Sequence, residues 1–285
     1  MTVNAIYLST VKLFEDQNIL DANLEVRYII EKALDFSHTD FILRKNFPVS
    51  EEQTLRILGL AGERLSGVPI QYVLGKWEFM GEDFFVGAGV LIPRPETEIL
   101  VEKVIQYAQK VKNPVVFDLC SGSGCIGISV KNAVPNARVV LVEKSDQALV
   151  YLKKNVEKFG FSDKIQVIQG DILALGEEFS NLPEPNIIVS NPPYIKSDEV
   201  PTLQSEVLFE PKMALDGGAD GYVFYKKLTQ LWLPMIQNGR IMIECGEAQA
   251  STIEKMFASA SDFTEIVKDY NKIDRIVIGG KNNDN

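Results

Sequence analysis

The sequence is poor in histidine and cysteine and has no long apolar stretch. His38 is the only histidine among 285 residues, which argues against histidine-based acid–base catalysis and against a metal site. The three cysteines are an odd number without paired spacing, so they predict a reducing, cytoplasmic environment rather than a disulfide framework. The longest apolar runs are about five residues, whereas a membrane-spanning helix needs roughly 20. We therefore expect no membrane segment, and Met1–Thr10 does not have the pattern of a signal peptide.

Positive charge is also scarce. The chain has 29 lysines and arginines and 39 aspartates and glutamates, which gives a net charge of −10. A protein that binds duplex nucleic acid through many phosphates carries a basic excess instead, so direct binding of nucleic acid is not expected. Apolar residues make up 46% of the chain, which is ordinary for a globular protein and too high for a disordered one.

Residues 1–75 predict a small helical domain. Apolar residues in Asp21–Phe36 follow helical spacing. Ser50 and Gln53 match a capping box, which predicts the start of another helix. The apolar residues that then share one face of this helix are Leu55, Leu58, Ala61 and Leu65. This domain lacks the glycine-rich turns and alternating strands that appear later in the chain.

Residues 76–95 predict a β-hairpin linker, and residues 96–285 predict an α/β domain. Aromatic residues and glycines cluster in the linker, and Pro93–Pro95 is extended by proline geometry before a helix begins. From residue 114 strands and helices alternate, which predicts a parallel-rich, doubly wound, Rossmann-like sheet. The candidate strands are Val115–Leu119, Arg138–Val142, Ile165–Ile168, Asn186–Ser190, Arg240–Glu244, Phe263–Val267 and Arg275–Ile278.

A glycine-rich turn follows the first strand of the α/β domain. Within Asp118–Gly127, the residues Gly122, Gly124 and Gly127 form the pattern G-x-G-x-x-G, whose glycines permit positive φ and close approach of the backbone to a ligand. Glu143 ends the second strand, where an acid binds the two hydroxyls of an adenosine ribose. The pattern predicts an adenosine-containing cofactor, either NAD or S-adenosylmethionine. The alternative is that the glycines only let the helix pack on the strand.

Asp171 and Ile172, which follow the third strand, are candidates for contact with the adenine ring. The Asp171 carboxylate is a possible acceptor for the adenine amino group, with the Ile172 side chain against the ring. The alternative is that Gly170 and Asp171 simply form a turn.

The segment Asn191-Pro192-Pro193-Tyr194 follows the fourth strand, at the sheet edge where open α/β folds bind ligands. Proline lacks an N–H and has a fixed φ, so Pro193 keeps Pro192 extended and its carbonyl rigid. This carbonyl and the Asn191 side-chain oxygen are two acceptors for the hydrogens of a planar –NH₂ group, and Tyr194 supplies a ring for its flat face. The alternative is a strand-ending turn with a core tyrosine.

Such a site fits methyl transfer from a sulfonium to a nitrogen. This in-line displacement depends on positioning and electrostatics. The attacking nitrogen is neutral, and the alkylated nitrogen loses its proton readily, so no strong general base is needed. A chain with one histidine is compatible with that chemistry.

The glycine turn together with Asn191–Tyr194 resembles S-adenosylmethionine-dependent amino-methyltransferases, a group that includes DNA adenine and protein glutamine methyltransferases. Three further segments resemble the HemK/PrmC family, which methylates a glutamine side-chain amide in peptide chain release factors. These segments are Gly67–Tyr72, Leu91–Glu98, and Phe209–Pro211 with Ala214–Gly218. The resemblance extends from the helical domain to the final strand.

The resemblance implies a class I methyltransferase fold and methylation of the glutamine in the Gly-Gly-Gln loop of release factors, which yields N5-methylglutamine. The helical domain is then expected to recognise the release factor. Cofactor-binding residues are expected to be Asp118, Cys120, Ser121, Gly122, Ser123, Gly124, Glu143, Asp171, Ile172 and Asn191. The residues expected to bind the glutamine and support catalysis are Asn191, Pro192, Pro193 and Tyr194. At Cys120 a glycine is common in the family.

Some roles and functions stay open at this point. Pro93–Glu98 and Phe209–Gly218 fit a structural role, including that of a loop over the site, as well as they fit substrate contact. A DNA adenine methyltransferase is compatible with the amine-binding segment, since adenine N6 is also a planar –NH₂. However, flipping a base needs backbone contacts, and residues 1–75 have ten acidic and seven basic residues. A protein that binds the cofactor without catalysis is the third possibility, against which the intact Asn191–Tyr194 argues.

Overall fold

The computed structural model describes residues 1–282 and divides into two compact units. The first unit comprises Met1–Lys76 and a short segment from later in the chain, Gln204–Phe209. The second comprises Trp77–Leu203 and the chain from Glu210 onward. Over the described residues, no helix combines the length and apolar character that a membrane span requires.

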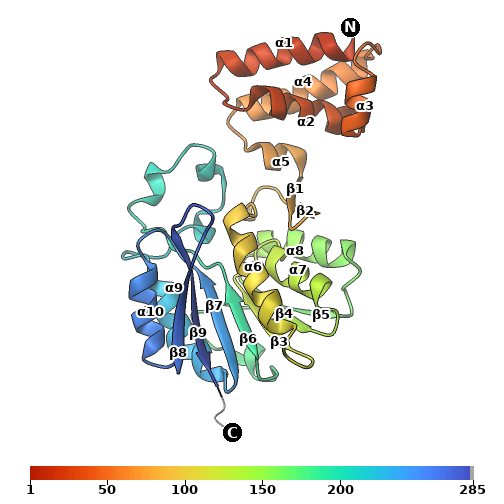
Figure 1. Ribbon diagram of the computed structural model, residues 1–285. Coiled ribbons are helices and arrows are strands. Elements are labelled where there is room, and N and C mark those ends of the chain that lie inside the picture. The colour runs from red at the N-terminus through yellow and green to blue at the C-terminus, as the bar shows by residue number, and fades with distance from the viewer. Residues whose placement is uncertain (283–285) are drawn as a thin grey trace. The chain divides into compact units, whose positions relative to one another are not determined.

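Residues 1–76 of the first unit form a helical bundle, as the sequence predicts. Its core is made by fully buried apolar residues such as Phe14, Ile29 and Ile57. The helices, labelled in Figure 1, are α1 (Val3–Asp16), α2 (Ala22–Leu34), α3 (His38–Leu43), α4 (Glu51–Leu65) and α5 (Ile70–Leu74).

Helix α4 begins with the predicted capping box, but its buried face matches the predicted apolar one only at Ala61 and Leu65. The Ser50 hydroxyl accepts from the Gln53 backbone N–H at 3.1 Å, and the Gln53 side chain accepts from the Ser50 N–H at 2.9 Å. Leu55 and Leu58, however, are 65% and 45% exposed. The residues buried on α4 are Ile57, Ala61 and Arg64.

Arg64 explains why the apolar spacing misplaces this face. Its guanidinium forms an ion pair with Glu25 at 2.6 Å and with Glu206 at 2.5 Å, so a charged residue occupies a buried position. An arginine can occupy such a position because its long aliphatic stem is apolar and only its head needs a charged partner. The spacing of apolar residues cannot identify a buried position that is occupied by a charged residue.

The predicted hairpin is present and precedes the larger sheet in the chain. Strands β1 (Lys76–Phe79) and β2 (Glu82–Phe85) are joined by Met80 and Gly81, which both have positive φ, 55° and 77°. Positive φ at both central residues is the requirement of a type I′ hairpin turn. The Met80 backbone N–H donates to the Glu98 carboxylate at 2.7 Å, which fixes the turn to helix α6 (Pro95–Ala108).

All seven predicted strands occur in one sheet, in the order β5-β4-β3-β6-β7-β9-β8. The first five strands of this order are parallel, and β9 runs antiparallel to both of its neighbours. Their bounds are β3 (Val115–Leu119), β4 (Arg138–Glu143), β5 (Ile165–Gln169), β6 (Ile187–Ser190), β7 (Gly239–Glu244), β8 (Phe263–Lys268) and β9 (Asp274–Lys281).

Helices cover both faces of this sheet, which makes the predicted doubly wound architecture (Figure 1). Alternate residues of the central strands point to opposite cores, so that Val139 packs on one side and Val140 on the other. One core is shared with α6, α7 (Cys125–Ala133) and α8 (Asp146–Lys158). The other is shared with α9 (Val223–Lys227) and α10 (Ala250–Ala258).

The β3–β6 junction positions the loops that matter for function. Along the chain the sheet first grows from β3 towards β5 and then resumes on the other side of β3 with β6, so the topology switches between these neighbours. Leu119 of β3 is aligned with Ser190 of β6, and the Ser190 hydroxyl donates to the Leu119 carbonyl at 2.6 Å. Cys120 and Asn191 therefore leave the sheet side by side, where doubly wound folds bind ligands.

We predict opposite effects on stability for two glycine-to-alanine changes in helices. At Gly127 of α7 an added Cβ would lie 2.3 Å from the Leu141 side chain in the core, so Gly127→Ala should destabilise by about 1–3 kcal/mol. At Gly62 of α4 nothing lies within 4 Å of an added Cβ, so Gly62→Ala should stabilise the helix by about 0.5–1 kcal/mol. Calorimetric unfolding of both variants measures these changes, and an equal rise in both would contradict the packing argument.

Candidate functional site

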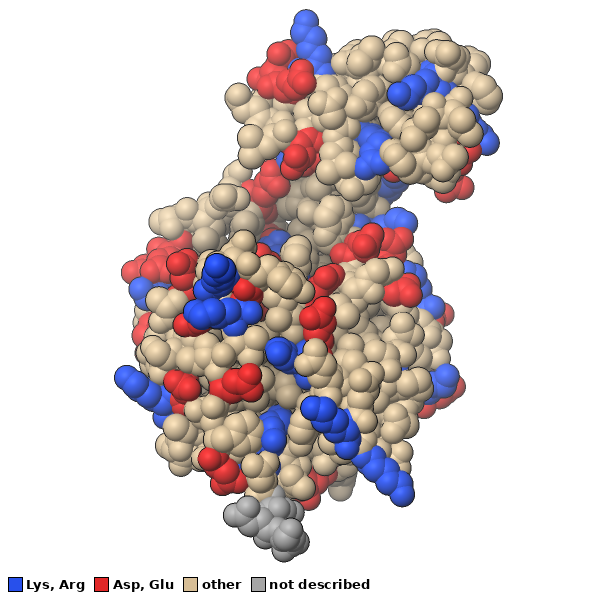
Figure 2. All heavy atoms as spheres, viewed as in Figure 1, with Lys and Arg blue, Asp and Glu red and all other residues tan. Residues whose placement is uncertain are grey.

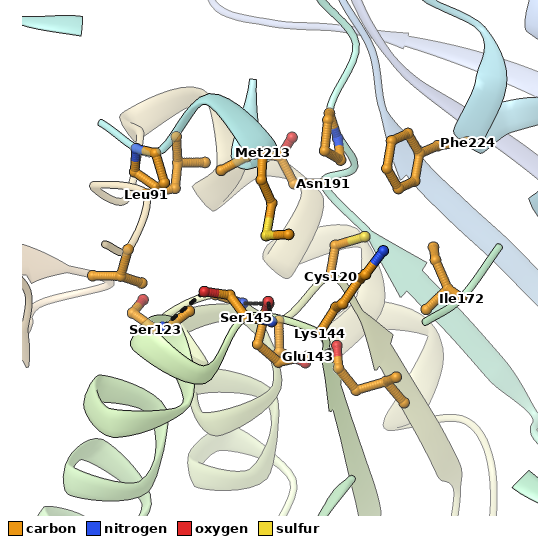
Figure 3. A pocket seen from close by; sticks show the side chains of 18 of the residues that line it. Leu91, Cys120, Ser123, Glu143, Lys144, Ser145, Ile172, Asn191, Met213 and Phe224 are labelled. Atoms are coloured by element: carbon orange, nitrogen blue, oxygen red, sulfur yellow. Dashed lines mark hydrogen bonds between the residues drawn. The ribbon is translucent and has the colours of Figure 1, made fainter. Parts of the chain in front are cut away.

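A cavity of about 440 Å³ lies in the larger unit at the carboxyl ends of β3, β4, β5 and β6. Figure 3 shows Glu143 and Ser145 on one side of it and Asn191 and Met213 across from them. Phe224 and Ile172 lie together at one end. The cavity thus has one polar wall and one apolar end.

The structure brings most of the predicted site residues to this cavity. Those that line it are Cys120, Ser121, Gly122, Ser123, Glu143, Asp171, Ile172, Asn191 and Pro193. Four others are not among the residues that line it, namely Asp118, Gly124, Pro192 and Tyr194.

The glycine-rich turn adopts left-handed backbone conformations at three positions. Gly122 and Gly124 have φ of 55° and 81°, which glycine adopts without steric cost. Cys120 has φ of 61°, a conformation that costs a residue with a Cβ about 1–2 kcal/mol. This conformation gives the physical reason why a glycine suits that position. The Ser121 N–H donates to the Val142 carbonyl at 3.0 Å and holds the turn against β4.

Asp118 braces the turn from behind the cavity. It is fully buried, and one carboxylate oxygen accepts from the Gly127 N–H at 2.9 Å while the other has no hydrogen-bond partner. Burial raises the pKa of this carboxyl to about 8, and the bond from Gly127 opposes that shift. The side chain therefore connects the end of β3 to the start of α7 instead of reaching the cavity.

The Glu143 carboxylate faces the cavity from the end of β4. Its two oxygens accept from the backbone N–H groups of Gly122 at 2.8 Å and Ser145 at 2.7 Å. Burial raises the pKa of Glu143, and these backbone hydrogen bonds oppose the shift. A carboxylate has about four acceptor positions, so acceptor capacity remains for hydroxyl groups of a ligand.

Asp171 and Ile172 have structural partners as well as positions at the cavity. The Asp171 carboxylate pairs with Lys144 at 2.8 Å and accepts from the Leu173 N–H at 3.0 Å, so the turn that was the alternative for this residue is also present. The Ile172 carbonyl accepts from the Trp232 indole N–H at 2.8 Å, which fixes the backbone while the Ile172 side chain lines the cavity.

The Asn191 amide is held by the buried Thr97, which is held in turn by the buried Glu244. Its Nδ2 donates to the Thr97 hydroxyl at 3.1 Å. The Thr97 hydroxyl in turn donates to the Glu244 carboxylate at 2.6 Å. Asn191 therefore directs its nitrogen towards Thr97, and its oxygen is the group left for a ligand.

The rest of the Asn191–Tyr194 segment is packed tightly from behind. The Tyr194 carbonyl accepts from the Gln249 side chain at 3.1 Å, and burial raises the pKa of the Tyr194 hydroxyl to about 12. An added Cβ at Gly217 would lie 2.7 Å from the Tyr194 Cα. Only a glycine fits between these backbones, so the glycine pair after Asp216 has a steric role.

The two segments whose role was open brace each other at the cavity. The buried Glu210 carboxylate accepts from the Ile92 N–H at 3.0 Å and forms an ion pair with Arg94. Arg94 and Met213 also line the cavity. Both segments therefore have a structural role and border the site.

Sequence reasoning missed several side chains of this region. Thr97 lies in a segment noted for its resemblance but was not identified individually. Glu244 had a usable signal, because it ends a strand next to the one that precedes Asn191. Phe224 had none, since an aromatic residue near the start of a short helix is usually packing.

We predict that the destabilising effect of ionised Asp118 grows with pH. Its pKa in the folded protein, about 8, is above the unfolded value, so the protonated form is favoured on folding. The stability that the protonated Asp118 carboxyl contributes is complete below pH ~4 and is lost as the pH rises through about 8. Asp118→Asn keeps the acceptor for Gly127 without the charge. The variant should gain stability relative to the wild type as the pH rises from about 4 to about 8, measured by thermal unfolding, and a pH-independent difference would contradict this.

Comparisons with known proteins agree with this site. Residues 95–229 match the methyltransferase small domain family, and residues 7–75 match the PrmC N-terminal domain family. The release factor glutamine methyltransferase of Geobacter sulfurreducens is 36% identical over 93% of this chain and 91% of its own length. That of Clostridium acetobutylicum is 34% identical over 90% of each.

A methyltransferase of known structure from Pyrococcus furiosus shares the fold, with a TM-score of 0.54, 14% identity, and coverage of 72% of this chain and 91% of that one. The predicted class I methyltransferase fold is confirmed, and S-adenosylmethionine is the cofactor. The chain belongs to the release factor glutamine methyltransferase family.

Proposed function

We propose that this protein transfers the methyl group of S-adenosylmethionine to the side-chain amide nitrogen of the glutamine in the Gly-Gly-Gln motif of peptide chain release factors. Family membership supports the reaction. The observation that carries it is the alignment of Leu119 with Ser190, since it puts the glycine turn and the Asn191–Tyr194 segment beside one cavity. Cofactor and substrate nitrogen can then meet between two neighbouring strand ends.

The residues that line the cavity support this choice of cofactor by their chemistry. When bound, S-adenosylmethionine supplies a methyl group activated by a sulfonium. Glu143 accepts from the ribose hydroxyls with the acceptor positions that its two backbone bonds leave free. Ile172 and Phe224 provide apolar surface for the flat adenine ring, and Asp171 accepts from its amino group.

The turn Cys120–Gly124 completes the proposed cofactor site. Its left-handed glycines let the backbone approach the ligand closely. Asp118 contributes from behind the cavity by fixing the start of α7, so its proposed role in cofactor binding is indirect. Gly124 has the same kind of indirect role, because its Cβ position faces the core residue Ile128 at 3.0 Å.

The glutamine amide is proposed to be held by acceptors. The Asn191 Oδ1 and the Pro192 carbonyl each accept one hydrogen of the –NH₂ group, and Pro193 keeps that carbonyl extended. Tyr194, which packs against the core of the larger unit and does not line the cavity itself, is proposed to place its ring against the flat face of the amide where the substrate enters. Drawing both hydrogens towards acceptors raises the electron density on nitrogen as positive charge develops on it. The alkylated nitrogen then loses a proton to solvent, so no side chain needs to act as a strong base.

A protein substrate also fits the charge of the chain better than a nucleic acid does. On the face shown in Figure 2, basic side chains are interspersed with acidic ones rather than gathered in a basic patch. With a net charge of −10, this favours a release factor over duplex DNA. We assign recognition of the release factor to residues 1–75, linkage to residues 76–95, and methyl transfer to residues 96–285. Because release factors act on the ribosome, the proposed location is the cytoplasm.

The proposed reaction predicts a defined product and a defined inactive variant. Incubation of the protein with S-adenosylmethionine and a release factor should add one methyl group to the Gly-Gly-Gln peptide, detected by mass spectrometry. Asn191→Ala removes an acceptor for the amide, so activity should fall at least a hundredfold while cofactor affinity stays within about threefold. An unmodified peptide, or methyl incorporation into DNA instead, would refute the proposal. Full activity of Asn191→Ala would refute the mechanism.

The proposed ribose contact predicts a loss of cofactor affinity in Glu143→Gln. The substitution replaces one acceptor oxygen by a donor, so the dissociation constant for S-adenosylmethionine should rise about tenfold or more. Glu157→Gln, an exposed change of the same type on α8, is the matched control and should leave the affinity unchanged. Isothermal titration calorimetry measures both, and equal affinities for the two variants would remove Glu143 from the site.

A further inference from the structure

If the Asn191 side chain must accept a hydrogen bond from the substrate, a neighbouring group has to fix the orientation of its amide. The two ends of a side-chain amide have nearly the same shape, but one accepts and the other donates. A rotated Asn191 would present its –NH₂ to the –NH₂ of the glutamine, and the two donors would repel. The site therefore requires a group that recognises the nitrogen end of Asn191 and leaves the oxygen for the substrate.

Thr97 has the right position and the right number of protons for this role. A hydroxyl has one proton to donate. An ionised carboxylate only accepts hydrogen bonds. The Thr97 hydroxyl therefore donates its proton to the ionised Glu244 carboxylate, 2.6 Å away. Towards Asn191, 3.1 Å away, Thr97 is then only an acceptor. The chain of hydrogen bonds thus has one direction, from Asn191 through Thr97 to Glu244.

The fold holds these three residues in place. Ser190 of β6 is aligned with Ile243 of β7. The next residues, Asn191 and Glu244, therefore lie beside each other at the ends of these neighbouring strands. Thr97 lies in the first turn of α6. Thr97 and Glu244 are each only 2% exposed, so water does not compete for their hydrogen bonds.

We propose that Thr97 and Glu244 are positioning residues that orient the Asn191 amide so that its oxygen faces the glutamine nitrogen. The inference rests on the proposed function, since it presumes that Asn191 accepts from the substrate. Neither residue needs to touch the substrate for this role. Together they set which end of Asn191 the substrate meets.

The direction of this series of hydrogen bonds depends on the charge of Glu244. A protonated Glu244 donates to Thr97, whose own proton then turns towards Asn191 and selects the rotated amide. Burial raises the pKa of Glu244 to about 7, while the bond from Thr97 opposes the shift. Other groups around Glu244 also act on it. Arg275 on β9 and Arg94 near the start of α6 lower its pKa, whereas Glu96, also near the start of α6, raises it. The Tyr194 hydroxyl interacts with the same carboxylate, and the Tyr225 hydroxyl donates to the Glu244 backbone carbonyl at 3.2 Å.

The test compares Thr97→Val with Thr97→Ser in methylation of a release factor. Valine keeps the shape but has no hydroxyl, so kcat/KM should fall about tenfold or more, whereas serine, which keeps the hydroxyl, should retain most of the activity. Cofactor affinity, measured by calorimetry, reports that both variants are folded. Glu98→Gln is the matched control, because Glu98 is in the same turn of α6 and accepts from the Met80 backbone N–H of the hairpin at 2.7 Å.

The pH profile separates orientation from a general structural effect. In the wild type, kcat/KM should rise as Glu244 ionises, between about pH 6 and 8. Glu244→Gln cannot ionise, so this rise should be absent. An unchanged rise in Glu244→Gln overturns the proposal. So does wild-type activity in Thr97→Val, equal losses in the valine and serine variants, or an equal loss in Glu98→Gln.

These outcomes are distinct from a failure of the proposed function. If the wild type does not methylate the release factor, or if Asn191→Ala is fully active, the assignment of the reaction or of Asn191 fails, and the role of Thr97 falls with it. If the wild type is active, Asn191→Ala is inactive and Thr97→Val matches the wild type, only the positioning role is refuted.

Discussion

The parallel pairing of β3 with β6 is the constraint on which the rest of the site depends. It aligns Leu119 with Ser190, and the Ser190 hydroxyl closes the pair at the Leu119 carbonyl. The two loops that follow are the glycine turn and the Asn191–Tyr194 segment. Neither loop carries the proposed chemistry alone, because one offers backbone and space and the other offers acceptors. Their function comes from leaving the sheet at the same level.

Buried carboxylates recur at the strand ends around this point. Asp118 stands near the end of β3, Glu143 ends β4, and Glu244 ends β7. Burial raises the pKa of each of them, and at least one hydrogen-bond donor opposes the shift in each case. The donors are backbone N–H groups for the first two and the Thr97 hydroxyl for the third. Asp118 fixes the turn, Glu143 faces the cavity, and Glu244 accepts from Thr97, through which we propose that it orients Asn191.

The sheet was predictable because its strands are short apolar runs separated by turns, and a strand buried on both faces leaves a clear pattern. The glycine turn and Asn191–Tyr194 were predictable because glycine permits backbone conformations that other residues avoid and proline fixes φ, so both can be recognised from the residue types. Their meeting at one cavity follows from a general rule of open α/β sheets. The buried face of α4 was not predictable from spacing, because it includes the charged Arg64. The support of Asn191 by Thr97 was also hidden, since 94 positions separate these residues in the chain.

The polarity of the proposed amide site explains its selectivity for a nitrogen with two hydrogens. Asn191 Oδ1 and the Pro192 carbonyl are both acceptors, so a substrate group with two donors satisfies both. A hydroxyl has only one proton and would leave one acceptor without a partner, which costs free energy. The same argument applies to the glutamine itself, whose carbonyl end would meet two acceptors if the side chain were reversed. An all-acceptor site therefore selects both the group and its orientation, provided that the Asn191 amide itself does not rotate.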